Sequence, residues 1–284
     1  MSAQGVPQSI GSYKIMRPVA RGIMGTVYVG TTGENVYHAI KVLDPDAAEK
    51  LPFAPRFAGE IKGDHILDYK EMDITSDNKQ YFVTEYLEVK PISREKFPGL
   101  NSAAIVTIFA TVAETVQSVH AKGLAHGNLK RSNVLVRRAE GPAVPYVADW
   151  GITYIYDPAK FVGPKFAKTF PYMSPERIEQ LIGGVDSKSA PPTPAMDIYA
   201  LGVSLCDVLT GALPYADVED AKELLEKKKK QRYFVVGSTH PSRKVDIERL
   251  NAAIARSTAY DAGKRYRTMK EFGEDLRSCV PSPE

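Results

Sequence analysis

Cysteine is scarce in this 284-residue sequence, which has only Cys206 and Cys279. A disulfide framework or a cysteine-ligated metal cluster would need more, so a reducing compartment is expected. Net charge is also small, because 37 basic and 34 acidic residues leave +3. That balance argues against nucleic acid or an anionic membrane surface as the default partner.

Long apolar runs are absent too. No stretch approaches the roughly 18 consecutive apolar residues of a membrane span, and positions 1–12 lack the basic end and apolar core of a signal peptide. We therefore expect a cytoplasmic protein, either complete or the cytoplasmic part of a longer membrane-anchored chain. The basic run Lys227–Lys230 is a local exception. A solvated helix face is the favoured interpretation of it, and a polyanion site is the alternative.

What the sequence does contain is ordinary core material, with 43% hydrophobic residues, 15 tyrosines and 10 phenylalanines. Its length suits one domain with two lobes, or two small domains. The first part favours short strands, because β-branched and aromatic residues gather in segments separated by Gly, Asn and Asp. The strands expected from this pattern are Tyr13–Val19, Thr26–Thr31, Val36–Val42 and Tyr81–Tyr86.

After Pro91 the pattern becomes helical. Apolar residues recur on one face of a long buried helix, namely Ile105, Ile108, Phe109, Val112, Val116 and Val119. Thr268 and Glu271 form a capping-box pattern at the start of the last helix, and Ser189–Pro194 is expected to be a surface loop. Further helices are expected over Asp197–Leu209, Val218–Lys229, Asp246–Ser257 and Met269–Ser278. The prediction is an α+β protein with a mainly β first part and a mainly helical second part.

Three features of the first part indicate phosphate chemistry. Gly22 and Gly25 lie in a turn between two strands, where a backbone without side chains can approach a phosphate. Alone this turn is weak, and a plain hairpin explains it equally well. Lys41 ends the next strand and can direct its ammonium at the phosphates under the turn. Glu60, nineteen residues later, can hold Lys41 by an ion pair.

The second part supplies oxygen ligands. His126-Gly-Asn-Leu-Lys-Arg-Ser-Asn133 is followed by Ala148-Asp-Trp-Gly151, so that Asn133 and Asp149 are expected to converge. Mg²⁺ usually takes one or two protein carboxylates together with phosphate oxygens and water. In this order, and with Ser-Pro-Glu176 and Asp197-x-Tyr-x-x-Gly after them, the motifs resemble the protein kinase superfamily, especially bacterial Ser/Thr kinases of the eukaryotic type.

The resemblance extends from about Tyr13 to Leu276. It implies a bilobal kinase fold: an N-terminal extension 1–12, a small antiparallel β lobe 13–88, a helical lobe 89–279 and a tail 280–284. It also implies that ATP and Mg²⁺ bind between the lobes and that Asp197, Glu176 and Arg265 are scaffold residues. The implied site residues are Gly22, Gly25, Val27, Ala39, Lys41, Glu60, Thr84 (gatekeeper), Glu85 and Leu87 (hinge) and Leu135 for the nucleotide, Asn133 and Asp149 for the metal, and Asn128 and Lys130 at the catalytic position.

The sequence departs from a working kinase at the catalytic position itself. His126-Gly127-Asn128 stands where active kinases have His-Arg-Asp, whose Asp accepts the proton of the substrate hydroxyl. An amide cannot take that proton. General-base assistance contributes on the order of 10² to 10⁴ in rate, which corresponds to about 3 to 5 kcal/mol of barrier. Slow turnover is therefore expected, although positioning and charge also contribute to phosphoryl transfer.

Other departures surround this one. Gly127 replaces an arginine that commonly reads an activation-loop phosphate, and no Ser or Thr lies between Thr153 and Thr169. Switching by Ser/Thr phosphorylation of this loop is therefore not expected. Trp150 replaces the usual Phe, and its bulk is predicted to fix the orientation of Asp149. The helix that carries Glu60 is expected to be short, which weakens the predicted Lys41–Glu60 pair.

The favoured function is an ATP-binding pseudokinase that regulates or scaffolds a client protein of unknown identity. A weakly active Ser/Thr protein kinase is the alternative, and an inert scaffold ranks third. Burying a lysine and a carboxylate without a ligand is costly, so the retention of Lys41, Asn133 and Asp149 favours nucleotide binding. No nucleic-acid partner is expected, and the sequence predicts no oligomeric state.

Overall fold

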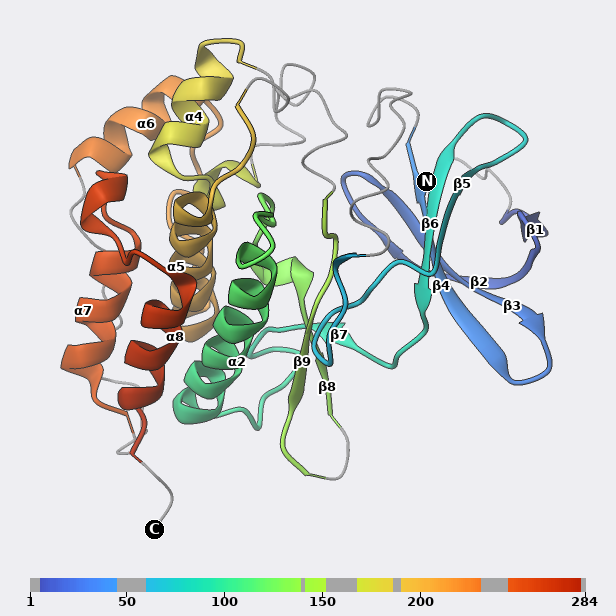
Figure 1. Cartoon of the computed structure of the whole chain (residues 1–284), viewed down its shortest axis with the longest axis horizontal. Coiled ribbons are helices and arrows are strands. Elements are labelled where there is room, and N and C mark those ends of the chain that lie inside the picture. Colours follow the sequence, from blue (N-terminus) through green and yellow to red (C-terminus); the bar gives the residue numbers. More distant parts are fainter. Residues whose placement is uncertain are drawn as a thin grey trace.

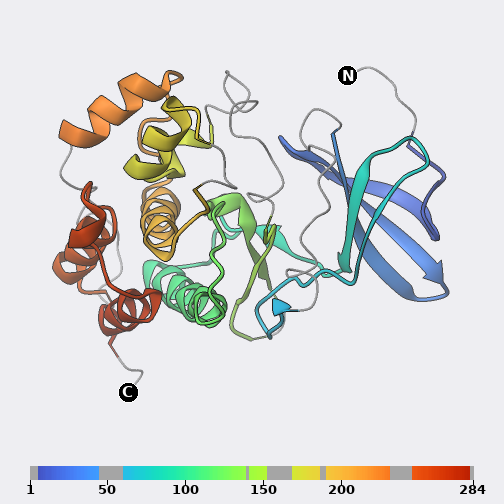
Figure 2. The ribbon, with the colours of Figure 1, turned by 45° about the horizontal axis from the view of Figure 1, so that its top comes forward.

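The structure is a computed structural model that describes residues 6–44, 60–138, 141–151, 168–185, 190–230 and 245–281. Figures 1 and 2 show a β lobe formed by the N-terminal strands and a larger helical lobe that contains the C-terminal helices. A small second sheet lies between the two. The described residues thus have the predicted α+β, two-lobed arrangement.

The first lobe is a six-stranded antiparallel sheet in the order β1-β2-β3-β4-β6-β5. Its four long strands confirm the strand predictions, whereas β5, with charged residues at two of its four positions, was not expected. The strands are β1 (Ser9–Ile10), β2 (Tyr13–Arg21), β3 (Gly25–Gly33), β4 (Val36–Leu43), β5 (Glu71–Ile74) and β6 (Gln80–Glu85).

The edge strand β1 corrects the predicted start of this lobe. Ser9 pairs with Lys14 and Ile10 with Tyr13 across a tight turn. The side chain of Ile10 is buried and packs with Tyr13, Ile40 and other residues of the outer sheet face. The stretch predicted as an N-terminal extension therefore contributes a strand and a core residue to the first lobe.

The second lobe begins with a three-stranded sheet in the order β7-β8-β9, formed by β7 (Lys90–Pro91), β8 (Val134–Arg137) and β9 (Val144–Val147). Helices form the rest of it: α2 (Ser102–His120), α4 (Pro175–Ile182), α5 (Pro194–Thr210), α6 (Ala221–Lys230), α7 (Ile247–Ser257) and α8 (Met269–Ser278), with short turns η1 (Arg131–Asn133), η4 (Phe170–Tyr172) and η5 (Ala262–Lys264).

Helix α2 is the central element of the helical lobe and confirms the predicted buried helix. It packs against α5, α8 and β9, and it lies between the other helices and the small sheet in Figure 1. By length and composition alone α2 could span a membrane, but 67% of its apolar window is buried inside the fold. Here it is a core helix, and both cysteines are likewise free and buried in this lobe.

The helix ends follow the capping chemistry of the sequence. Thr268 caps α8 by accepting from the Glu271 N–H at 3.1 Å, but the Glu271 carboxylate accepts from Arg267 rather than from Thr268. The predicted capping box is thus half formed. Pro194, placed in the predicted loop, is the first residue of α5, where a missing N–H costs nothing.

One continuous core joins the two lobes. Leu43 and Phe82 of the first sheet belong to the same buried cluster as Val147 and Trp150 at the end of the second sheet, with Tyr69 between them. The residues predicted to meet the nucleotide border this junction. The core therefore fixes the two sheets that frame the candidate site.

Candidate active site

Strand pairing decides which face of the first sheet borders the second lobe. Residues directly opposite each other on neighbouring strands share a face, and Lys41 is paired with Val27 on β3 and Phe82 on β6. Ala39, two residues before Lys41, is paired with Thr84. Val27, Ala39, Lys41 and Thr84 are therefore on one face, which is the arrangement predicted for the adenine and phosphate side.

Lys41 confirms that this face borders the second lobe. Its Nζ lies 2.6 Å from Oδ1 of Asp149, which follows β9. The two side chains are 17% and 22% exposed, so water can still reach the pair. A lysine and a metal-binding aspartate predicted from separate motifs thus meet across the lobe junction.

The predicted Lys41–Glu60 ion pair is wrong for this structure. Glu60 is exposed, and its backbone carbonyl accepts a hydrogen bond from the Lys122 ammonium. The next residue, Ile61, is 2% exposed and belongs to the core. Because Ile61 is turned inward at this point, the carboxylate of Glu60 faces solvent. The rest of the segment predicted as a short helix, 51–59, lies outside the described residues.

The carboxyl of Asp149 is held ionised by its neighbours. Burial favours the neutral acid, but the Lys41 ammonium, assisted by Lys130, lowers the pKa of Asp149 below its usual value. Its backbone has φ = 63°, a left-handed conformation that is uncommon for residues other than glycine. Such conformations persist only where the surroundings impose them.

Trp150 supplies part of those surroundings. Its side chain is 1% exposed and its ring lies 4.6 Å from that of His126. The indole Nε1 donates to the Val147 carbonyl at 2.9 Å, and the Trp150 carbonyl accepts from the Tyr69 hydroxyl at 2.8 Å. These contacts fix the backbone beside Asp149, in agreement with the role predicted for the tryptophan.

Asp197 braces the loop that carries Asn128, as the kinase resemblance implied. From the buried helix α5 its carboxylate accepts the backbone N–H groups of His126 and Gly127, at 2.7 and 2.8 Å. Its Oδ2 also lies 2.8 Å from Nε2 of His120. With 1% of its surface exposed, Asp197 has protein partners in place of water.

His126 fixes the same loop from the other side. Its Nε2 lies 2.9 Å from the Ala148 carbonyl and its Nδ1 lies 3.2 Å from the Asn128 N–H. A neutral imidazole protonated at Nε2 satisfies both contacts, since it donates to the carbonyl and accepts from the amide. Burial lowers the pKa of His126, although Asp197 opposes the shift. The loop is therefore held by a neutral histidine and by the hydrogen bonds to the Asp197 side chain.

Asn133 and Asp149 adjoin each other through the second sheet. The Ala148 N–H donates to the Asn133 carbonyl at 3.0 Å, one residue before Asp149. The side-chain nitrogen of Asn133 donates to the Asn128 carbonyl at 2.9 Å, and its amide oxygen accepts a long contact of 3.5 Å from the Ser132 hydroxyl. No cluster of three or more His, Cys, Asp or Glu side chains occurs in the described parts of the chain. One carboxylate and one amide oxygen suit Mg²⁺ that is bound largely through phosphate and water.

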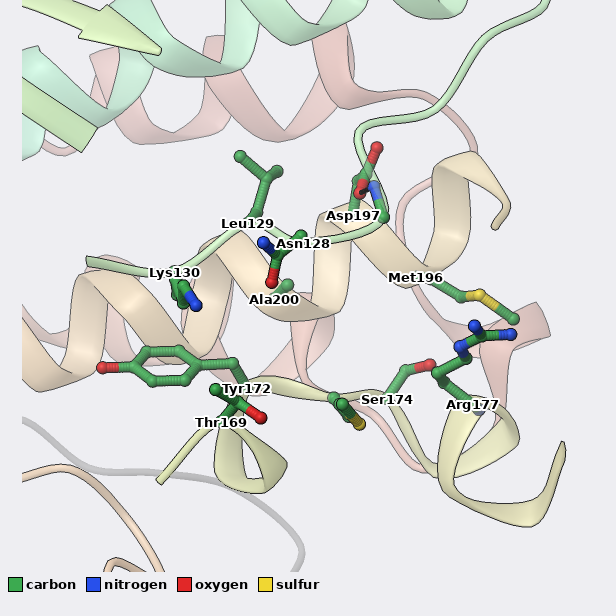
Figure 3. A pocket seen from close by; sticks show the side chains of 12 residues that line it. Asn128, Leu129, Lys130, Thr169, Tyr172, Ser174, Arg177, Met196, Asp197 and Ala200 are labelled. Atoms are coloured by element: carbon green, nitrogen blue, oxygen red, sulfur yellow. Dashed lines mark hydrogen bonds between the residues drawn. The ribbon is translucent and has the colours of Figure 1, made fainter. Parts of the chain in front are cut away.

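Asn128 and Lys130 line a small pocket of about 30 Å³. Figure 3 shows these two side chains on one wall, with Thr169, Tyr172 and Ser174 on the opposite wall. Burial lowers the pKa of Lys130 to about 8, with Asp149 opposing and Lys41 reinforcing the shift. The second wall was not predicted from the sequence, although it directly precedes the Ser-Pro-Glu motif.

The glycine turn has one position that only glycine can occupy. Gly25 has φ = 155°, and a Cβ there would lie 2.0 Å from the Val42 carbonyl oxygen. Gly22 closes the turn by donating to the Gly25 carbonyl at 2.8 Å. Arg21, at the end of β2, pairs at 2.7 Å with Asp44, which follows β4. The turn is thus a tight hairpin end that brings bare backbone to the edge of the lobe junction.

The remaining nucleotide residues lie where the resemblance placed them along the chain. Thr84 and Glu85 end β6, and Leu87 follows in the link to the second lobe. Leu135, on β8, pairs with Pro91 and Tyr146. The adenine contacts of Val27, Ala39, Leu135 and the link remain predictions.

The scaffold pair is formed as expected. Arg265 donates to both carboxylate oxygens of Glu176, at 2.7 and 2.8 Å, and to the backbone carbonyls of Ala195, Ala259 and Tyr260. Such a bidentate pair is among the stronger hydrogen-bonded arrangements in proteins. Residues 152–167, which contain Thr153, Tyr154 and Tyr156, lie outside the described residues.

Comparisons with known proteins agree with this geometry. Residues 13–272 match the family described as protein kinase domain. The chain is 31% identical to the serine/threonine-protein kinase Pkn1 of Myxococcus xanthus over 76% of its own length and 31% of that protein. It is also 31% identical to the serine/threonine-protein kinase AfsK of Streptomyces coelicolor, over 74% of its length and 26% of that protein. The chain thus spans about a third or less of these relatives.

Among solved structures, the chain resembles the PknI kinase domain of Mycobacterium tuberculosis, with a TM-score of 0.68 at 22% identity. The match covers 99% of this chain and 100% of that one. Both lobes are therefore included in the similarity of fold.

Proposed function

Because this chain belongs to the protein kinase family, we propose that it binds ATP with Mg²⁺ between its lobes and acts as a pseudokinase that regulates or scaffolds a client protein. One observation carries the proposal. The phosphate and metal residues Lys41 and Asp149 meet at 2.6 Å, whereas the position of the catalytic base holds Asn128.

The nucleotide half of the proposal follows from the Lys41–Asp149 pair. Bound Mg²⁺ would neutralise phosphate charge and order the phosphates. Asp149 and the amide oxygen of Asn133 would hold it, and Lys41 would turn from Asp149 to the phosphates. Oδ1 of Asp149 contacts the Lys41 ammonium, and we expect this contact to open when the nucleotide binds.

The limited chemistry follows from Asn128. Its side-chain amide can orient a hydroxyl by hydrogen bonding but cannot accept the proton that transfer releases. Lys130, with a pKa of about 8, lies in the same pocket. In its mainly protonated form it can stabilise negative charge, but it cannot replace the base. Little or no phosphotransfer is expected.

A slow Ser/Thr protein kinase is the second candidate. The relatives Pkn1 and AfsK are named serine/threonine-protein kinases, and the pocket beside Asn128 still contains Lys130 and Thr169. Phosphoryl transfer depends mainly on positioning and charge, so a site without its base can retain a low rate. This candidate shares the nucleotide site with the first and differs only in turnover.

Two measurements on the purified chain separate the candidates. ATP with Mg²⁺ should raise the melting temperature of the wild type, because a ligand that binds only the folded state stabilises it. The Asp149→Ala variant should lose this shift. The absence of any shift at saturating nucleotide would refute nucleotide binding and, with it, both candidates.

The second measurement follows labelled phosphate from ATP to the chain itself and to a general protein substrate. A pseudokinase should show no transfer above the Asp149→Ala background, whereas a slow kinase should show transfer that this variant abolishes. Asn128→Asp should then increase transfer by on the order of 10² or more if the missing base is the main defect.

A further inference from the structure

One lysine of the basic run on α6 is not a surface residue. Lys228 is 3% exposed, whereas Lys227 pairs with Glu223 and Lys229 with Glu226 at the surface. The prediction of a solvated face is therefore wrong for Lys228. It lies four residues after Leu224 and three after Leu225, which places it on the buried stripe of the helix.

The Lys228 amine has two specific partners in its buried setting. Its Nζ donates to the Pro171 carbonyl and to the Tyr199 hydroxyl, both at 2.8 Å. It also lies 4.6 Å from the centre of the Tyr199 ring. Burial, reinforced by Arg265, lowers the pKa of Lys228 well below its usual value. A buried amine is tolerated only when its donors are satisfied, and both contacts serve this need.

The Pro171 carbonyl connects Lys228 to the candidate site. Pro171 is the middle residue of η4. Thr169 and Tyr172 on either side of it form the pocket wall opposite Asn128 and Lys130 (Figure 3). Leu224 and Leu225 pack with Phe170 in the same small core. Helix α6 therefore contacts the back of this wall through a polar and an apolar contact.

We propose that Lys228 is a positioning residue that holds the turn Phe170–Tyr172 and thereby couples helix α6 to the pocket beside Asn128. Through this contact, a displacement of α6 changes the wall of the pocket, while the Lys41–Asp149 side has no contact with Lys228. The inference rests on the proposed function only in taking this pocket as the side that faces a protein substrate or client.

Hydrogen exchange followed by mass spectrometry tests this directly, because it needs no activity. In Lys228→Met, the amides of Tyr172 and Met173, which close the turn by bonding to Thr169 and Phe170, should exchange about tenfold faster. Peptides from α2 and α8, which do not contact Lys228, should exchange as in the wild type. Lys229→Met, one residue away and also removing one ammonium, should leave the turn unchanged.

A purely stabilising role predicts a different pattern. It would speed exchange in α2 and α8 by the same factor as in the turn, and that result would overturn the proposal, as would an unchanged turn. Lys228→Gln, which keeps a donor, should restore part of the protection. If Lys228→Met does not fold, Tyr199→Phe, which removes one of the two bonds, should give a smaller acceleration confined to the turn.

The nucleotide thermal shift keeps this inference separate from the proposed function. Lys228→Met should show the same ATP-dependent shift as the wild type. Lys228 contacts Pro171 and Tyr199, and neither is among the residues proposed to bind the nucleotide. A wild type without any shift would refute the proposed function and leave the exchange result to decide on Lys228. A shift lost only in Lys228→Met would contradict the separation of the two sides.

Discussion

The two sides of the candidate site are built from charges in opposite ways. On the nucleotide side, Lys41 and Asp149 form one contact at 2.6 Å and both remain partly exposed. On the anchoring side, Asp197, Arg265 and Lys228 are each at most 3% exposed, and each makes two or more hydrogen bonds. Lys41 and Asp149 can therefore exchange their mutual contact for contacts with a ligand. The hydrogen bonds of Asp197, Arg265 and Lys228 have no such replacement, so losing them destabilises the fold.

This difference means that the residue at the catalytic position can change without disturbing the fold. Replacing the base by Asn128 removes one proton acceptor, but it leaves untouched the backbone bonds from His126 and Gly127 to Asp197. The backbone of this loop is held by Asp197 of α5. Its conformation therefore does not depend on which side chain occupies position 128. Loss of activity and loss of structure are therefore separable in this molecule, and substitutions should separate them.

The largest effect is expected from Asp197→Ala. The change leaves two backbone N–H groups and the His120 ring without their buried acceptor, which should cost about 3 to 5 kcal/mol of unfolding free energy. Urea denaturation followed by circular dichroism measures this. Glu274→Ala, an exposed surface change, is the control and should have no measurable effect. Equal stability of the two variants would show that Asp197 is not an anchor.

An intermediate effect is expected from pH through His126. Burial lowers its pKa, so the unfolded chain takes up a proton below about pH 6.5 while the folded chain does not. The stability that this group contributes is complete above pH 6.5 and falls as the pH drops towards the folded-state pKa. Between pH 7 and 5 the wild type should lose about 1 to 2 kcal/mol more than His126→Gln. Parallel pH profiles for the two proteins would contradict a buried neutral imidazole.

The smallest effect on stability is expected from Lys41→Met, on the exchangeable side. A single, partly hydrated ion pair contributes about 1 kcal/mol or less, so unfolding in urea should change little. The ATP-dependent thermal shift should nevertheless disappear, since the variant lacks the phosphate contact. A large loss of stability together with a retained ATP-dependent shift would show that Lys41 has a structural role and does not bind the nucleotide.

Local patterns in the sequence predicted most of the fold. The apolar spacing from Ile105 to Val119 identified α2, and β-branched segments identified the four long strands. Several short elements were missed because their local signals are weak, among them β1 and the three strands of the second sheet. Strand β5 is four residues long with two acidic members, and α4 begins at Pro175, in a motif read for its family role.

The sequence identified most residues of the candidate site, but it did not predict correctly which of them forms an ion pair with Lys41. Asp197 and Glu176 lie where the resemblance implied, because each is in the first turn of a helix. Arg265 follows η5 and is fixed by its two hydrogen bonds to Glu176. Glu60 depends on how one segment approaches the sheet, and spacing along the chain cannot specify that approach. The structure pairs Lys41 with Asp149 in its place.

Lys228 was misjudged for a different reason. Four consecutive lysines indicate a charged surface, but any four consecutive helical residues point in every direction around the axis. One of them must lie on the stripe that begins with Leu224 and Leu225. The position of Lys228 relative to Leu224 and Leu225 around the helix axis predicts its burial, whereas the composition of the run does not.

The contact between Lys41 and Asp149 has a thermodynamic consequence for binding. It acts as an internal competitor: if the open form is one tenth of the population, the apparent dissociation constant for ATP is about tenfold larger than that of the open site. A client protein that favours the open form would remove this penalty without touching the nucleotide. By linkage, ATP would then strengthen binding of that client by the same factor. A domain without its catalytic base could in this way still report ATP to its partners.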